Sequence, residues 1–370
     1  MKVVEKYKLP SGVELKNRLF FAPISTMEDA LDGKITENEL AFFRQRTGKV
    51  GAIVVASAYV SQNGRGYGNN ISISHDRFIP SLSKIAQTIQ KNETKAILQI
   101  YHGGANAKRR DNTDLLYCVS HQSTYLEGSN DYHELTETEI QKNISDYSKA
   151  ILRAVKAGFD GVELHVANSY LPNQFLLPNW NLRNDQWGGS LRKRVKFTEE
   201  IIKASLRVIQ ENKETPFALG IRFSLEDTML MEDNEREKSF KESLAILKIL
   251  DQLGLDYIHL TSSDCLAKKE LNNNSFDLLE IIKQVVIKTP VISSGNLLQS
   301  ESVEQALQHT ELASACRPFI FVPNWAEKIV NQEEVILPEK LLTGETRQTY
   351  NIPRNLWRGI LETPDWYLYR

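Results

Sequence analysis

One short segment of the chain carries three side chains that can donate hydrogen bonds to a ligand. His165, Asn168 and Tyr170 fall within six residues of one another, where a short apolar run passes into a polar loop. An imidazole, a carboxamide and a phenol suit an anionic or electron-rich ligand, because each donates a hydrogen bond to it. A single histidine at such a place is more often structural, so this prediction depends on the clustering of the three residues.

A second segment has the composition of a phosphate-binding loop. Residues 290–296 read PVISSGN and lead toward a predicted helix that begins near Ser300. Gly295 lets a ligand approach the backbone closely, with Asn296 directly after it, and Arg317 offers a cation that can bind phosphate through two N–H groups. The alternative interpretation is a glycine turn beside a surface arginine.

Regular elements must position these segments, and the clearest pattern in the chain is an alternation of short apolar runs with longer stretches of helical periodicity. Near-continuous apolar runs are typical of strands that are buried on both faces of a parallel sheet. Eight runs of this kind predict strands at residues 19–22, 52–57, 96–101, 161–165, 217–223, 257–260, 291–293 and 312–315. The stretches between and after them predict helices at residues 37–46, 80–90, 136–157, 191–212, 234–253, 276–288, 300–309 and 325–330.

Eight strand–helix repeats predict an α/β protein with a (β/α)8 TIM barrel as a single domain. An open doubly wound sheet is the alternative, but no GxGxxG sequence follows the first predicted strand. Long loops follow two strands, at residues 103–135 and 165–190, where a barrel builds its active site. We assign residues 1–337 to the barrel and 338–370 to a C-terminal extension, which packs on the barrel or on a neighbouring subunit.

The ends of the predicted strands converge on one mouth in a barrel, and the side chains there share one character. They are small residues, hydrogen-bond donors and two arginines: Ser25, Thr26, Ser57, Gln99, His102, His165, Asn168, Arg222, Gly295, Asn296 and Arg317. None of these residues is a carboxylate or a lysine. We therefore expect no metal site, and a metal-dependent or Schiff-base aldolase is disfavoured.

The overall composition excludes several classes of protein. Hydrophobic residues make up 41% and charged residues 25% of the 370 positions, as in ordinary globular proteins. The formal charge of −2 gives no basic surplus for binding nucleic acid. Three distant cysteines predict neither a disulfide framework nor a zinc site. The N-terminal residues lack the apolar core of a signal peptide and no apolar run reaches ~20 residues, so we expect a cytoplasmic protein without membrane contact.

The segment around His165 resembles the signature of the old yellow enzyme family. Residues 158–190 read GFDGVELHVANSYLPNQFLLPNWNLRNDQWGGS and depart from the family pattern mainly at Ser169, Leu177 and Trp187. Residues 15–25, 98–104 and 220–224 match further family segments in the same order. The resemblance covers roughly residues 5 to 330 and implies an FMN-dependent oxidoreductase on a (β/α)8 barrel, with NADH or NADPH as the reductant.

The resemblance also implies roles for individual residues. Pro23, Ile24, Ser25, Ser57, Gln99 and Arg222 would contact the flavin ring, and Gly295, Asn296 and Arg317 its phosphate. His165 and Asn168 would donate hydrogen bonds to the carbonyl oxygen of an activated alkene, and Tyr170 would then protonate the α-carbon. The partners implied are small molecules, and a homo-oligomer is left open.

The match is weakest near the last two strands. The family has two glycines where Gly295 and Asn296 stand, and Gly-Arg-Pro where Cys316, Arg317 and Pro318 stand. Asparagine tolerates unusual backbone angles, whereas Cys316 is expected to weaken FMN binding. A degenerate, non-catalytic barrel that binds flavin or phosphate ligands is therefore the alternative function.

Overall fold

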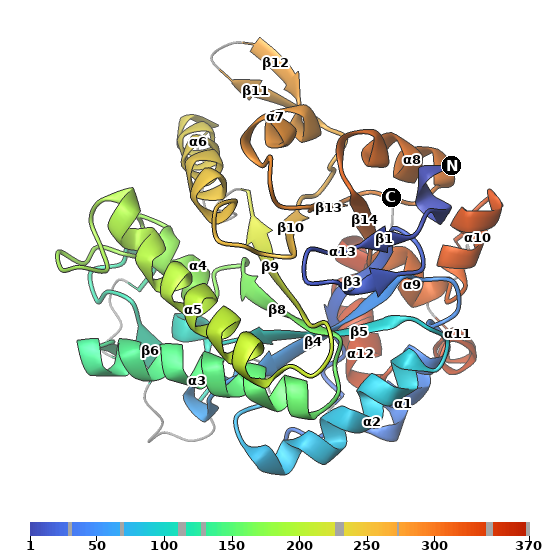
Figure 1. Ribbon diagram of the computed structural model, residues 1–370, viewed down its shortest axis with the longest axis horizontal. Helices are drawn as coiled ribbons and strands as arrows, with labels where there is room; N and C mark the ends of the chain where they lie inside the picture. Colours follow the sequence, from blue (N-terminus) through green and yellow to red (C-terminus); the bar gives the residue numbers. More distant parts are fainter. Residues whose placement is uncertain are drawn as a thin grey trace.

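A closed barrel of eight parallel strands forms the centre of the molecule (Figure 1). The computed structural model describes residues 1–28, 32–66, 70–109, 116–126, 131–225, 233–271, 274–337 and 343–367. Going round the barrel, the strands follow the order β10-β13-β14-β3-β4-β5-β8-β9. Their bounds are β3 Leu19–Ser25, β4 Ala52–Tyr59, β5 Lys95–Tyr101, β8 Gly161–Val166, β9 Ala218–Ser224, β10 Tyr257–Thr261, β13 Val291–Ser294 and β14 Leu312–Ala315. All eight predicted strands are confirmed, and the open doubly wound sheet is wrong.

The apolar character of these strands follows from their burial on both faces. Every residue of β4, for example, is buried, because helices cover the outside of the barrel and side chains fill the inside. At the N-terminal end of the barrel, the interior packs against the hairpin of β1 (Tyr7–Lys8) and β2 (Glu14–Leu15). This hairpin closes the end opposite to the mouth, so a ligand has access from one side.

The outer helices agree with the predicted ones to within a few residues at most ends. They are α1 Glu37–Arg44, α2 Ile79–Gln90, α3 Glu137–Lys156, α5 Leu191–Asn212, α6 Asp233–Leu250, α7 Leu278–Val285, α8 Ser300–His309 and α10 Trp325–Asn331. Thr136 and Glu139 form a capping box at the start of α3, in which each side chain accepts a hydrogen bond from the other residue's backbone N–H.

The helix predicted at residues 276–288 begins too early. Phe276 lies on β12 (Asn274–Asp277), which pairs antiparallel with β11 (Lys268–Leu271), and α7 starts only at Leu278. Figure 1 shows this hairpin projecting beyond α7. Phe276 is 44% exposed, so its apolar side chain was not the start of a buried helix face.

The loop between β8 and α5 is held by a buried arginine. Arg194 donates hydrogen bonds to the carbonyl oxygens of Leu176 and Gly189, each at 2.7 Å, and to Glu242 at 2.7 Å. The family-like residues at 185–194 therefore shape the turn into α5 rather than reach the mouth.

The C-terminal segment is fixed to the barrel by Arg46 and Asn355. The fully buried Arg46 guanidinium donates to the carbonyl oxygens of Phe319, Ile320 and Tyr350. Asn355 Nδ2 donates to the carbonyl oxygen of Met27 at 2.7 Å. The segment contains α11 (Gly344–Thr349), α12 (Arg354–Glu362) and α13 (Pro364–Tyr367). Residues 338–342 and 368–370 lie outside the described part of the chain, so the domain boundary at 337 stays a prediction.

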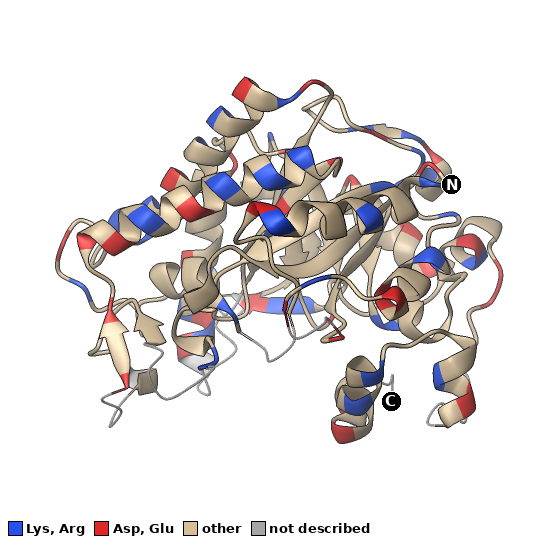
Figure 2. Cartoon of the chain, turned by 90° about the horizontal axis from the view of Figure 1, so that it is seen from below, with Lys and Arg blue, Asp and Glu red and all other residues tan. Residues whose placement is uncertain are grey.

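Charged residues are distributed over the outer helices without segregation by sign. Figure 2 shows Lys and Arg interspersed with Asp and Glu along these helices. No helix among the described residues is long and apolar enough to cross a bilayer.

Replacing Gly220 with alanine tests the packing inside the barrel. A Cβ at Gly220 on β9 would lie 2.2 Å from the ring of the fully buried Tyr257. We expect Gly220→Ala to lower the free energy of unfolding by about 1–3 kcal/mol, as overpacking does, measured by urea denaturation. Gly48→Ala is the control, since a Cβ there meets nothing within 4 Å. Equal stabilities of the two variants would contradict this packing.

Candidate functional site

The mouth of the barrel contains a cleft with two lobes. One lobe, of about 500 Å³, includes Arg317 and is called the Arg317 lobe. The other, of about 280 Å³, includes His165 and is called the His165 lobe. Pro23, Asn168 and Arg222 line both, so the lobes are parts of one site.

The twelve residues to which the family resemblance gives a role all line this cleft. The His165 lobe contains Pro23, Ile24, Ser25, Ser57, Gln99, His165, Asn168, Tyr170 and Arg222. The Arg317 lobe contains Gly295, Asn296 and Arg317. Residues from seven different strand ends or the loops after them thus meet, because the parallel strands of a closed barrel all end on one side.

Two consecutive residues in left-handed conformation make the sharp turn after β8. Asn168 has φ 55° and Ser169 has φ 54°. The backbone N–H of Asn168 donates to Ser224 Oγ at 3.1 Å, and that of Ser169 to Asn173 Oδ1 at 2.9 Å. The turn leaves the Asn168 side chain exposed in the cleft. The left-handed φ also explains why the family pattern has glycine where Ser169 stands.

His165 and Tyr170 are packed edge to face. Their ring centroids lie 4.7 Å apart at an interplanar angle of 78°. Tyr101 also packs against Tyr170, with ring centroids 4.9 Å apart. These contacts restrict the rotamers of both cleft residues, which are each less than a tenth exposed.

The imidazole of His165 is neutral. Burial lowers the pKa of His165 to about 3, and the positive charge of Arg222 acts in the same direction. The ring nitrogen Nδ1 is buried without a hydrogen-bond partner among the described residues. An unpaired buried nitrogen beside a cleft is costly, and a ligand that accepts or donates there would remove the cost.

A row of hydrogen bonds fixes the amide of Gln99 at the floor of the His165 lobe. Ser57 Oγ donates to Gln99 Oε1 at 2.6 Å, and Gln99 Nε2 donates to Glu163 Oε1 at 2.8 Å. Arg222 donates through Nη1 to His259 Nε2, and its Nη2 lies 3.4 Å from Ser294 Oγ. The floor therefore presents an oriented amide and a guanidinium to the lobe.

The Arg317 lobe is built from the loops after β13 and β14. Gly295 has φ 131°, and a Cβ there would lie 2.5 Å from the carbonyl oxygen of Ser262. Asn296 follows with φ 54°, which asparagine tolerates better than most residues. Cys316, with φ −118°, needs no glycine. Residues 295–297 and 315–317 line the lobe, whereas the start of α8 at Ser300 does not.

Two residues of the predicted mouth do not line the cleft. Thr26 is 2% exposed, and its hydroxyl donates to Glu39 Oε1 at 2.5 Å. His102 is completely buried, and its Nδ1 accepts a hydrogen bond from the backbone N–H of Gly104 at 3.0 Å. Both are structural.

Sequence reasoning missed the contribution of the C-terminal segment. Thr363, Trp366 and Tyr367 line the His165 lobe, and Asp365 and Trp366 line the Arg317 lobe. The tail was expected to pack on the barrel or on a neighbour, but nothing local in its sequence points to the mouth. Its abundance of aromatic residues was the only available signal.

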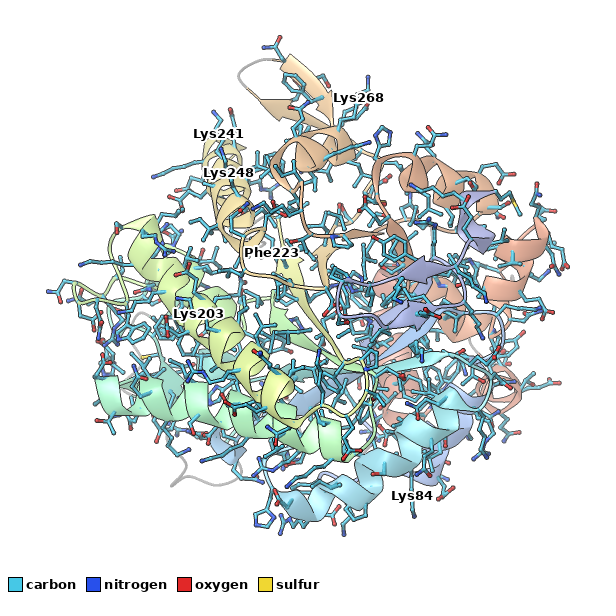
Figure 3. The ribbon with its side chains drawn as sticks, in the orientation of Figure 1. Lys84, Lys203, Phe223, Lys241, Lys248 and Lys268 are labelled. Atoms are coloured by element: carbon cyan, nitrogen blue, oxygen red, sulfur yellow. The ribbon has the colours of Figure 1, made fainter. Side chains whose placement is uncertain are left out.

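Lysines and metal-binding clusters do not contribute to the described part of the cleft. Figure 3 labels Phe223 on β9, whose side chain packs in the core between the strands and the outer helices. The other labels mark lysines on the outer helices and on the hairpin: Lys84, Lys203, Lys241, Lys248 and Lys268. The described lining residues include no lysine. Among the same described residues, no group of three or more His, Cys, Asp or Glu side chains could hold a metal ion.

A (β/α)8 barrel whose mouth joins an arginine-containing lobe to a lobe lined by hydrogen-bond donors has the form of the barrel enzymes that bind a phosphate-bearing cofactor. The sequence matches the model of the NADH:flavin oxidoreductase / NADH oxidase family over residues 8–335. The chain belongs to this family, and the resemblance seen in the sequence is confirmed.

Individual relatives agree with the family match. The protein named "Probable NADH-dependent flavin oxidoreductase YqiG" of Bacillus subtilis (strain 168) is 30% identical, over 99% of this chain and 97% of that protein. An NADH:acrylate oxidoreductase of Vibrio harveyi is 32% identical over 96% of this chain, and an NADH:fumarate oxidoreductase of Klebsiella pneumoniae is 31% identical over 97%. The chain spans only 35% and 39% of the length of these last two proteins.

Solved structures share the fold. Morphinone reductase in complex with tetrahydroNAD has a TM-score of 0.77 at 24% identity, covering 92% of this chain and 93% of that one. The old yellow enzyme homologue from Zymomonas mobilis has a TM-score of 0.78 at 22% identity, covering 95% and 99%.

FMN is the cofactor of this family, and the residues of the cleft fit it. The oriented amide of Gln99 and the guanidinium of Arg222 suit the polar edges of a flavin ring, and the unpaired Nδ1 of His165 is a further polar atom in the same lobe that needs a ligand. Arg317, at the far end of the continuous cleft, suits a phosphate. The predicted membership of an FMN-binding oxidoreductase family is therefore confirmed.

Three buried neutral histidines predict the pH dependence of stability. Burial lowers the pKa of His102 and His165 to about 3 and that of His259 to about 4, below the ~6.5 of an unfolded chain. Because the unfolded chain binds more protons below pH 6.5, each histidine should cost roughly 1.4 kcal/mol of unfolding free energy per pH unit there. Urea unfolding at pH 6.5, 5.75 and 5.0, with FMN at a fixed saturating concentration, measures this slope.

His102→Asn is the matched variant, because His102 lies outside the cleft. We expect it to lose about one third of the slope. A slope equal to that of the wild type would show that His102 is not the neutral buried group described here.

Proposed function

We propose that the protein transfers a hydride from NADH or NADPH to an activated alkene, such as an α,β-unsaturated carbonyl compound, in two successive half-reactions. One observation carries the proposal. His165 and Asn168 lie in the same lobe as Gln99 and Arg222, so a substrate held by the first pair would lie against a flavin ring held by the second. FMN bound in the cleft would supply the hydride carrier between the reduced nicotinamide and the alkene, which the His165 lobe would accept in turn.

The residues of the cleft floor hold and tune the cofactor. Gln99, oriented by the Ser57 hydroxyl, would bind the pyrimidine edge of the ring, and Arg222 would offset the negative charge that reduction adds there. Gly295, Asn296 and Arg317 would hold the phosphate, and Pro23, Ile24 and Ser25 would contact the ring. The side chain of Asn296 already donates to Asp264 Oδ2 at 3.1 Å, so its contribution to the phosphate comes from its backbone.

His165 and Asn168 polarise the substrate. Each donates a hydrogen bond to the carbonyl oxygen of the alkene, which makes the β-carbon electrophilic. The neutral state of His165 suits this role, because the ring donates without placing a full charge against Arg222. One donor of this kind is worth about 2.7–4 kcal/mol in comparable sites.

Tyr170 is the proton donor. Its ring is held against His165, so its hydroxyl belongs to the same lobe as the polarised oxygen. Transfer of the phenolic proton to the α-carbon completes the reduction of the double bond, and solvent at the mouth returns the proton.

The names of relatives support this substrate class. Acrylate and fumarate, in the names of the Vibrio and Klebsiella proteins, are both alkenes conjugated to a carboxylate. Those names describe much longer proteins, so the particular substrate is not carried over. NADH is named in both and NADPH in another relative, a dehydrogenase from Clostridium acetobutylicum, so either reductant is compatible with the family. A cytoplasmic location and a homo-oligomer remain predictions.

The alternative of a degenerate barrel rested on Asn296 and Cys316. Asn296 has a left-handed φ that asparagine tolerates, and Cys316 has an ordinary negative φ. Neither residue distorts its loop, so no observation favours loss of the cofactor site.

The colour of the protein tests the proposed function. Purified protein incubated with FMN should be yellow, should bleach when NADH or NADPH is added without oxygen, and should regain colour when cyclohexenone is added. Absorbance in the visible range follows each step. Protein that stays colourless after incubation with FMN would overturn the proposal, and colour that never bleaches would favour the binding-only alternative.

The variant His165→Ala tests the polarising role. We expect the rate of reoxidation by the enone to fall about 10²–10³-fold, because one donor to the oxygen is lost, while reduction by the nicotinamide falls much less. Stopped-flow absorbance separates the two half-reactions. His75→Ala, which removes an exposed histidine outside the cleft, is the control. Equal losses in both half-reactions of His165→Ala would contradict the role.

A further inference from the structure

Beneath the His165 lobe, the barrel interior holds a carboxylate to which the proposed function gives no role. Glu163 lies on β8 two residues before His165, so both side chains point into the barrel. Its exposed fraction is 0%. A buried carboxylate is costly unless it is paired and hydrogen-bonded, so the partners of Glu163 determine whether it can keep its charge.

The neighbours of Glu163 keep it ionised. Gln99 Nε2 donates to Oε1, and His259 Nδ1 donates to Oε2, both at 2.8 Å. Burial alone would raise the pKa of Glu163, but His259 and Arg222 together hold it below the ordinary value. The carboxylate therefore carries its negative charge inside the barrel.

His259 is neutral and lies between Glu163 and Arg222. Burial, and the positive charge of Arg222, lower the pKa of His259 to about 4. With its single proton on Nδ1, which faces Glu163, its Nε2 is free to accept the hydrogen bond from Arg222 Nη1. Ser314 Oγ lies 2.7 Å from the same Nε2 and fixes the ring further.

The imidazole thus separates two opposite charges. Arg222 on β9 is the register partner of His165 on one side and of His259 on the other. Without a spacer, attraction would draw the guanidinium down toward Glu163 and away from the cleft. With the spacer, Arg222 keeps its place in both lobes while Glu163 offsets part of its charge.

We propose that Glu163 and His259 are positioning residues, which hold Arg222 at the cleft and set how strongly its charge stabilises reduced FMN. The proposal rests on the proposed function, since it concerns the cofactor of that site. The midpoint potential of the flavin would then depend on the charge of Glu163 and on the neutral spacer His259, neither of which lines the cleft.

Two substitutions should shift the flavin potential in opposite directions. Glu163→Gln keeps the shape but removes the negative charge, so Arg222 acts at full strength and reduced FMN should be favoured about tenfold, a rise of about 30 mV. His259→Ala removes the spacer and lets Arg222 approach Glu163, so reduced FMN should be disfavoured by a similar factor. The double variant, Glu163→Gln with His259→Ala, should not show the lowered flavin potential of His259→Ala, because that lowering requires the Glu163 carboxylate.

The potentials are measured on the FMN-loaded protein by anaerobic reduction against a reference dye. Asp256→Asn is the control: Asp256 is a carboxylate 4% exposed, hydrogen-bonded to the backbone of Ser11 and Leu219 at the other end of β10. Asp256→Asn should change the factor by which reduced FMN is favoured by less than twofold. A merely structural role would shift both test variants in the same direction or not at all.

The outcomes separate this inference from the proposed function. This proposal alone would be overturned if the wild-type protein binds FMN and bleaches while both single variants favour reduced FMN to within twofold of the wild type. Wild-type protein that binds no FMN would overturn both. If Glu163→Gln does not fold, His259→Ala decides by itself, because a fall in its potential supports the spacer and an unchanged potential refutes it.

Discussion

The site depends on the parallel closure of the barrel. Eight strands that all run in one direction place their carboxyl ends on a single rim, whatever the sequence distance between them. Ser25 and Arg317 are nearly 300 residues apart and line the same cleft. The hairpin of β1 and β2 packs against the opposite end of the barrel interior, so a ligand reaches the strand ends from the mouth.

The charged groups inside the barrel, Arg222 and Glu163, are stabilised mainly by hydrogen-bonded partners rather than by contact with water. Most side chains that line the cleft are neutral, the charged ones being Arg222, Arg317 and Asp365, and the buried Glu163 lies below Arg222. A neutral imidazole can stand between an anion and a cation because burial keeps it from taking up a proton. The same desolvation makes His165 a donor without charge. One physical effect therefore serves both the stability of the interior and the chemistry of the mouth.

Much of the fold and of the cleft was predictable because the relevant signals are local. Apolar runs report burial of strands, and the residues directly after them must lie at the rim. Phe276 was misassigned because periodicity cannot distinguish an exposed hairpin residue from the start of a helix face. The tail could not be placed because its position depends on distant contacts, such as that between Arg46 and Tyr350. His259 looked like an ordinary strand residue, since its importance comes from partners on two other strands.

Trp366 has a further consequence for anyone handling this protein. It is 62% exposed and yet lines both lobes, so the last described turn of the chain forms part of the wall around the ligand. A purification tag or a fused domain joined after residue 367 would start at the rim of the cleft, where it would compete with ligands for space. The opposite end, where β1 and β2 close the barrel, offers an attachment point far from the chemistry.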